Sequence, residues 1–184
     1  VERRTGWFLE HGNRTNRGAD LGTWFHGNLT DEYAQGANAS LVFTVNLSNA
    51  SGPIMLNYAV DFDHEGNTFD NYFGEYLSAA GAWTGITQPG GIPGAGMLIG
   101  GKVYVDDSRG WQRVGHPLPQ SLSGNSSVLL RFRVFTDSFP GSGYGGTTID
   151  PPEGVFIDDL EVVSGPGANR RTHLYYNFTN ASQR

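Results

Sequence analysis

Carboxylates gather in one short stretch near the middle of the chain. Asp61, Asp63, Glu65 and Asp70 stand within ten residues, where the apolar run "IMLNYAVDF" ends. Crowded carboxylates repel one another unless a cation lies among them, and Ca²⁺ takes about six to eight hard oxygen ligands. The spacing imitates the start of an EF-hand loop, but Tyr72 occupies the twelfth position and the flanking residues predict strands rather than helices. We therefore expect either a calcium site of another kind or a solvated polar turn.

A second acidic pair lies in the apolar run "GVFIDDLEVV". Before Asp158 and Asp159 the apolar residues Val155 and Ile157 share one parity, and after them Leu160 and Val162 share the other. A change of parity inside a strand predicts a β-bulge, and a bulge would turn one of the two carboxylates in a new direction. This pair is the second half of the predicted metal site.

Motifs for catalysis are absent from the sequence. The chain has no cysteine, no G-x-S-x-G nucleophile elbow and no H-E-x-x-H zinc motif. "GMLIGGK" has the spacing of a phosphate-binding loop, but Val103 stands where that loop needs Ser or Thr, and no helix pattern follows. A distant pair of glycosidase carboxylates is the remaining alternative. We expect the chain not to be an enzyme.

The triplet Asn-x-Ser/Thr is frequent. It occurs at Asn13, Asn28, Asn38, Asn46, Asn49, Asn125, Asn177 and Asn180. This composition would give about two such triplets by chance. Acceptors for N-linked glycans lie on surfaces that pass through a glycosylating export path, although a Ser-, Thr- and Asn-rich set of turns produces the same triplets. We expect N-linked glycans and an extracellular or cell-surface location; the lack of cysteine favours an archaeal surface.

The elements that must position these residues are short strands. "IMLNYAVDF" puts Ile54, Leu56, Tyr58, Val60 and Phe62 on one face, and "VLLRFRVF" puts Leu130, Phe132 and Val134 on one face. Gly- and Pro-rich breakers separate such runs, and no amphipathic helix is evident. The chain therefore predicts an all-β, jelly-roll-like β-sandwich over residues 1–163.

Residues 164–184 predict a hinge, "SGPGANRR", followed by an extra C-terminal strand-like tail, "THLYYNFT". A strand needs a sheet edge to pair with, because its backbone groups must be hydrogen-bonded. That edge belongs either to the same chain or to a neighbouring copy that receives the strand as a donor.

Charge and hydropathy restrict the partners. The net charge is −6, with 12 basic residues against 18 acidic ones. An acidic domain is a poor nucleic-acid binder. No apolar run approaches the ~18 residues that span a bilayer, so no membrane span is expected.

The order of several motifs resembles the MAM-like domains and the accessory jelly-roll domain of immune-inhibitor-A-type secreted metalloproteases. The motifs are "LNYAVDFDHEGNTFDNYFGEYLSAAGAWT", "GWQRVGHPLP", "VLLRFRVFTDS" and "GVFIDDLEVV", in that order, and "GWFLEHG" looks like the opening strand. The resemblance covers about residues 6–163. It implies an extracellular, non-catalytic β-sandwich whose calcium ion is held by Glu10, by Asp61 or Asp63, and by Asp158 or Asp159.

These observations favour a structural subunit that assembles with copies of itself into a glycosylated filament, tube or surface layer. The alternative is a carbohydrate-binding or adhesion module, or an accessory domain of a secreted hydrolase. Sugar sites combine exposed aromatic rings with polar groups, and Trp24, Trp83 and Tyr144 are the candidates for that alternative.

Overall fold

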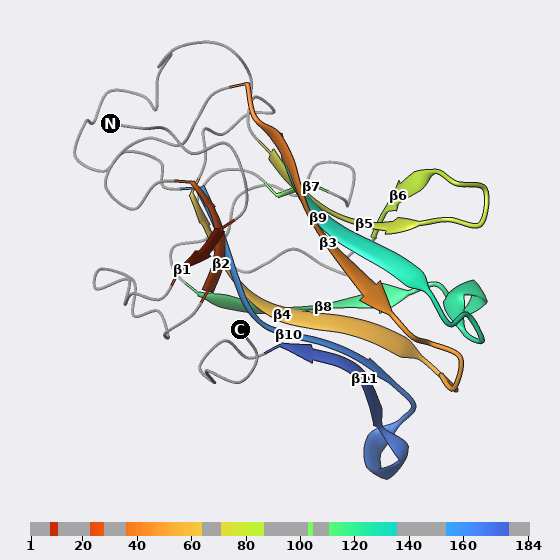
Figure 1. Cartoon of the computed structure of the whole chain (residues 1–184). Coiled ribbons are helices and arrows are strands. Elements are labelled where there is room, and N and C mark those ends of the chain that lie inside the picture. The colour runs from red at the N-terminus through yellow and green to blue at the C-terminus, as the bar shows by residue number, and fades with distance from the viewer. Residues whose placement is uncertain are drawn as a thin grey trace.

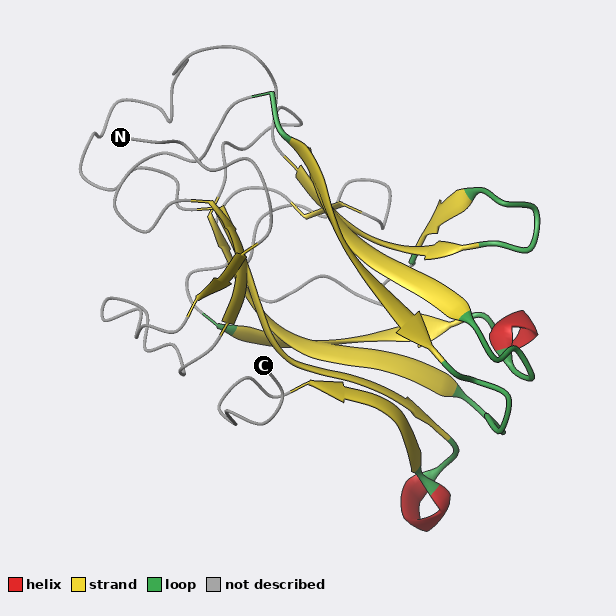
Figure 2. Ribbon diagram, in the orientation of Figure 1, coloured by secondary structure: helices red, strands yellow, loops and turns green. Residues whose placement is uncertain are grey.

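The computed structural model describes residues 8–10, 23–27, 36–63, 71–86, 103–104, 111–135 and 154–176; positions 8–10, 23–27, 62–63, 71, 103–104 and 154 are described as backbone only. Nearly all regular structure in these residues is β-strand, with two short 3-10 turns at Gln120–Leu122 and Gly167–Asn169 (Figure 2). The strands form two antiparallel sheets that face each other.

Each sheet has a core of four strands with short additions (Figure 1). The first sheet runs in the order β2 (Thr23–Gly27), β10 (Gly154–Ser164), β4 (Ile54–Asp63), β8 (Gln112–Leu118), with β1 (Phe8–Glu10) beyond β2 and β11 (Arg171–Tyr176) also paired with β10. The second runs β3 (Asn38–Val45), β9 (Val128–Phe135), β5 (Asn71–Leu77), β6 (Trp83–Gly85), with β7 (Val103–Tyr104) paired with β5.

The chain crosses repeatedly between the sheets, which is the jelly-roll arrangement of paired Greek keys. Strands β2, β4, β8 and β10 lie in the first sheet, while β3, β5, β6 and β9 lie in the second. The predicted all-β, jelly-roll-like sandwich is therefore confirmed.

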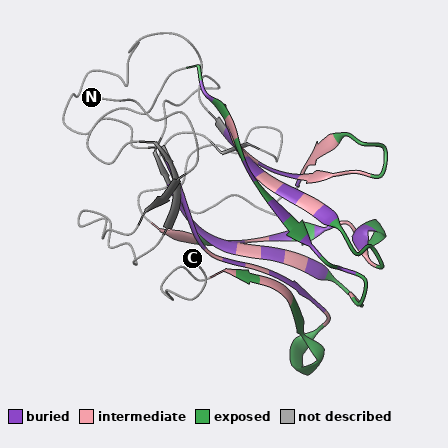
Figure 3. Cartoon of the chain, in the orientation of Figure 1, coloured by how far each residue is buried: buried purple, intermediate pink, exposed green. Residues whose placement is uncertain are grey.

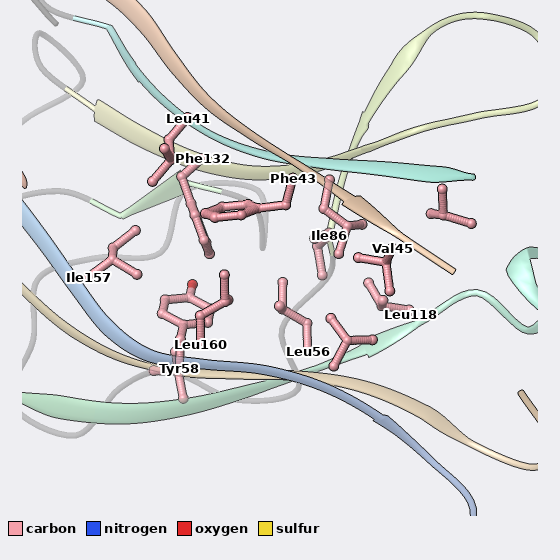
Figure 4. Packing of buried hydrophobic residues seen from close by; sticks show 14 of the residues in the cluster. Leu41, Phe43, Val45, Leu56, Tyr58, Ile86, Leu118, Phe132, Ile157 and Leu160 are labelled. Carbon is pink, nitrogen blue, oxygen red and sulfur yellow. The ribbon is translucent and has the colours of Figure 1, made fainter. Parts of the chain in front are cut away.

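The hydrophobic core lies between the two sheets, where the alternating residues of each strand meet (Figures 3 and 4). On β4 the core residues are Ile54, Leu56, Tyr58 and Val60, and on β9 they are Val128, Leu130, Phe132 and Val134. The rings of Tyr58 and Phe132 meet edge-to-face with centroids 4.7 Å apart. Complete burial of a side chain of this size contributes roughly 1.5–3 kcal/mol, so the inward faces predicted from period-two alternation hold the sandwich together.

Strand β10 carries the predicted bulge. Asp158 pairs with Ala59 and Glu161 pairs with Asn57, so β10 contains one residue more than β4 over this step. Within the bulge, Asp159 adopts a left-handed backbone conformation, with φ +48°. Val155 and Ile157 reach the core before the bulge, and Leu160 and Val162 reach it afterwards, which is the change of parity read from the sequence.

The C-terminal strand β11 pairs with β10 of its own chain. Leu160 lies opposite Tyr176 and Val162 opposite Leu174, along the part of β10 that follows its contact with β2. The Tyr176 ring lies 5.8 Å from the Phe43 ring, measured between centroids, so the tail also contacts the second sheet. The predicted hinge is the tight turn 165–170, and in this structure the tail is an integral strand of the sandwich.

Candidate functional site

The two buried acidic residues of the first sheet share its outer face, away from the core. Asp61 is 0 % exposed and Asp158 is 4 % exposed. Asp61 lies opposite Phe156, and Asp158 lies opposite Ala59. Residues that pair directly point to the same face, so the two carboxylates are diagonal neighbours on adjacent strands. The structure thus brings together one residue from each of the two acidic stretches.

The bulge separates Asp158 from Asp159. The backbone N–H of Asp159 donates to Asp158 Oδ1 at 2.7 Å, and the Asp159 carboxylate forms an ion pair with Arg113 on β8. Asp159 therefore turns toward β8, whereas one oxygen of Asp158 stabilises the bulge itself. Of the two predicted ligands on β10, Asp158 is the one beside Asp61.

The remaining predicted metal ligands have described backbones only. Glu10 lies opposite Thr23 on β2, and Asp63 lies opposite Gly154 on β10. Within the part of the chain that the structure describes, no three His, Cys, Asp or Glu side chains come together as a metal centre. Glu65 and Asp70 lie outside the described residues.

A groove of about 650 Å³ opens on the outer face of the same sheet, across β8, β4, β10 and β11. One row of the sheet forms its floor, from Gly115 through Asn57 and Glu161 to Tyr175. The polar and aromatic residues among its described lining are Asn57, Tyr58, Arg113, Asp159, Glu161, Arg170 and Tyr175. The four strands that carry them lie side by side (Figure 1).

Ion pairs and hydrogen bonds fix the groove's polar groups. Glu161 Oε1 accepts from Asn57 Nδ2 at 3.0 Å and also from Arg170 Nη2. The Glu161 and Asp159 side chains are 23 % and 21 % exposed, while those of Arg170 and Arg113 are 49 % and 77 % exposed. The carboxylates therefore lie deeper than the guanidinium groups that pair with them.

Gly115 is the small residue that leaves room for Asn57. A Cβ atom at position 115 would lie 2.8 Å from Asn57 Oδ1, closer than real Cβ contacts. Any larger residue there must displace the Asn57 amide. Glycine on β8 thus keeps the amide in place against Glu161.

Of the three sequence candidates for sugar binding, only Trp83 has a described side chain, and it does not line this groove. Trp83 lies on the outer face of the other sheet, and the Arg131 guanidinium stacks on its ring 4.1 Å from the centroid. Trp24 is described only by its backbone opposite Ile157, and Tyr144 lies outside the described residues. Sequence reasoning missed Tyr175, which is 48 % exposed. The alternation in "THLYY" carried the signal, because it puts Leu174 and Tyr176 on opposite parity to Tyr175.

The outer face of the second sheet contains a buried ion-pair cluster. Arg131 Nε donates to Glu75 Oε2 at 2.6 Å, and Arg133 Nε donates to the same oxygen at 3.3 Å. Arg133 stacks on Phe73 just as Arg131 stacks on Trp83. Each guanidinium is thus held between a carboxylate and a ring, an arrangement that orders this face.

Between the sheets lies a polar cluster of His116, Tyr58 and Tyr72. The Tyr58 hydroxyl is 2.9 Å from His116 Nε2 and 3.2 Å from the Tyr72 hydroxyl. Burial lowers the pKa of His116 from 6.5 to about 4, because a charged imidazolium loses its hydration there. The cluster is enclosed between the two sheets, and its three side chains are almost fully buried. Nearby in sequence, the Trp111 indole N–H is buried without a partner among the described residues.

Four predicted glycosylation sites fall in described residues, and all four asparagines are exposed: Asn38, Asn46, Asn49 and Asn125. The last three lie at one end of the sandwich, because Leu47 exchanges backbone hydrogen bonds with the 124–125 turn. Two of them also make turn contacts. Asn46 Oδ1 accepts from the Ser48 N–H at 3.0 Å, and Asn125 Nδ2 donates to the Leu122 carbonyl at 3.0 Å. Asn13, Asn28, Asn177 and Asn180 lie outside the described residues.

No protein-family model and no curated protein sequence is similar to the chain. No helix among the described residues has the length and apolar character needed to cross a membrane.

Proposed function

We propose that this chain is a non-catalytic structural subunit of an extracellular, glycosylated assembly built from copies of itself, and that Ca²⁺ stabilises its fold. The observation that carries the proposal is the placement of the sequons. Every described sequon asparagine is exposed, and three of them stand together at one end of the sandwich. Glycans there would cover that end, and a glycan at Asn38 would stand at the edge strand β3 of the second sheet, so contacts between copies would form on surfaces away from these positions.

The joint between copies would use these uncovered surfaces. On the second sheet, Val42 is 49 % exposed, whereas Phe135, which is 41 % exposed, lies opposite the sequon residue Asn38. Donation of the C-terminal strand, one of the two pairings that the sequence leaves open, would require β11 to leave β10 and Tyr176 to leave Phe43. A face-to-face or edge-to-edge contact involves no such loss, and head-to-tail contacts of either kind build fibres or layers.

Calcium would act at the acidic face. Asp61 and Asp158 are buried diagonal neighbours, and carboxylate oxygens are ligands that Ca²⁺ prefers. Asp63 and Glu10 are the further ligands that the sequence motifs propose. Because the unfolded chain has no such site, binding would add directly to the free energy of unfolding.

A carbohydrate-binding or adhesion module is the second candidate function, and the outer groove favours it. That role would also suit an accessory domain of a larger secreted protein. Fold class does not separate these possibilities, because the same sandwich serves many functions.

Size analysis and electron microscopy of the glycosylated protein test the primary proposal. We expect particles much larger than a monomer when the protein is concentrated in millimolar Ca²⁺, and mass spectrometry should find hexose at Asn46, Asn49 or Asn125. A protein that stays monomeric under these conditions, with unmodified asparagines, would rule out a glycosylated self-assembling subunit.

A further inference from the structure

We propose that the outer groove between β8 and β11 is a binding site for a neutral saccharide. The groove has the size of a small-molecule site, which is typically ~300–1,000 Å³. It is open to solvent and lined by planar polar groups beside an aromatic ring. This inference goes beyond self-assembly and stands or falls independently of it.

The groove's polar groups match the hydroxyls of a sugar ring. Each carboxylate uses only one oxygen for its ion pair: Asp159 uses Oδ2 and Glu161 uses Oε1. Among the described residues no donor reaches the second oxygen of either. These oxygens accept hydrogen bonds from hydroxyl groups, and the remaining guanidinium N–H groups of Arg113 and Arg170 donate to hydroxyl oxygens. Each sugar hydroxyl can both donate and accept a hydrogen bond, so adjacent hydroxyls can pair with a carboxylate oxygen and with a neighbouring guanidinium N–H.

The balance of charge selects a neutral ligand. Among the described lining residues two carboxylates face two guanidinium groups, so their charges balance. A phosphate or sulfate group would meet Asp159 and Glu161 on the floor, and an amine would meet Arg113 and Arg170 at the rim. Each such ligand would break an existing ion pair, whereas a neutral polyol leaves both in place.

Tyr175 supplies the apolar surface that a sugar also requires. It stands at one end of the floor row, opposite Glu161, with about half of its surface exposed. The C–H face of a pyranose packs on such a ring while the hydroxyls reach the polar floor. At the other end of the row Gly115 leaves room for the Asn57 amide, which stays on the floor of the groove against Glu161.

The first experiment presents neutral and acidic oligosaccharides to the full chain made in a bacterial host without N-glycosylation, so that no glycan of its own competes. We expect a neutral saccharide to bind with micromolar to millimolar affinity by calorimetry, and sulfated or uronic-acid sugars to bind at least about tenfold more weakly. Absence of binding to any neutral sugar overturns the proposal, and so does a preference for acidic ones.

Variants place the binding in this groove. Tyr175→Ala removes the ring and should weaken binding about tenfold, while Tyr175→Phe should retain most of it. Gly115→Ala should also weaken binding, because the new methyl group displaces Asn57. The matched control is Phe135→Ala, which removes an equally exposed ring from the other sheet. If Tyr175→Ala fails to fold, Gly115→Ala still tests whether the sugar binds in this groove. Wild-type affinity in Gly115→Ala overturns the assignment of the binding site to the groove.

The sugar could be foreign or could be carried by a neighbouring copy. If a neighbouring copy carries the sugar, the glycosylated protein should self-associate, and free oligosaccharide or the Gly115→Ala substitution should disperse it. If the sugar is foreign, the glycosylated protein should show the same affinity for the free sugar as the unglycosylated protein. Both results support a saccharide groove; self-association that neither treatment disperses, together with no binding of free sugar, overturns it.

Discussion

The imidazole Nε2 of His116 lies 2.9 Å from the Tyr58 hydroxyl, deep between the two sheets. His116 is 2 % exposed and Tyr58 is 1 % exposed. A titratable group in this position links the stability of the sandwich to pH.

Acid should destabilise the fold through His116. Its pKa falls from 6.5 in the unfolded chain to about 4 in the folded state. Between these values the unfolded chain binds the proton and the folded chain does not, so the free energy of unfolding should drop as pH falls from 6.5 to 4. The expected loss is about 3 kcal/mol, measured by urea denaturation at a series of pH values. His116→Gln should flatten this slope. Tyr58→Phe keeps the imidazole buried and should preserve it; an unchanged slope in His116→Gln would contradict the assignment.

Glu75 should contribute far more to the free energy of unfolding than the exposed ion pairs do. Its side chain is 9 % exposed and accepts hydrogen bonds from Arg131 and Arg133. Glu75→Gln removes the negative charge that pairs with the largely buried guanidinium groups of Arg131 and Arg133. We therefore expect the free energy of unfolding, measured by chemical denaturation, to fall by about 2–4 kcal/mol. Arg113→Gln is the comparison, because Arg113 is 77 % exposed, and it should cost less than about 1 kcal/mol. Equal losses in the two variants would refute the ranking.

The turn that leads into β11 should depend on Gly165. Its φ is +84°, and a Cβ atom there would lie 2.6 Å from the Asn169 carbonyl oxygen. Gly165→Ala should therefore destabilise the chain by about 2 kcal/mol or more and speed amide hydrogen exchange in β11. Gly124 has a similar φ of +85° but has open space around it. Gly124→Ala should therefore lower the free energy of unfolding only by the cost of a left-handed backbone at alanine, about 1 kcal/mol. If both variants lose the same stability, the contact with Asn169 is not what fixes the turn.

Calcium should stabilise the protein if Asp61 and Asp158 hold it. At a concentration of 100 times Kd the gain is about 2.7 kcal/mol, which raises Tm by roughly 5–10 °C in a domain of this length. Chelation should reverse the increase. Asp158→Asn should abolish the response, whereas Asp159→Asn should keep it, since Asp159 faces Arg113. A Tm that changes with neither added calcium nor chelator would contradict the proposed calcium site.

The sequence by itself determined the strands and their inward faces. Alternation identified the core residues of β4 and β9, and the change of parity in β10 located the bulge at Asp158 and Asp159. These features are local, because a strand that buries one face must repeat its apolar residues every second position.

Only the tertiary structure decided which residues meet across strands. Nothing local in the sequence puts Arg113 beside Asp159, or aligns Gly115, Asn57, Glu161 and Tyr175 in one row. These partners are up to about a hundred residues apart, and their neighbourhood depends on strand order and on the one-residue step of the bulge. The same register turned Asp158 toward Asp61 and Asp159 away from it. It also paired β11 with β10 of its own chain, along residues Leu160–Ser164, which follow the part of β10 that pairs with β2.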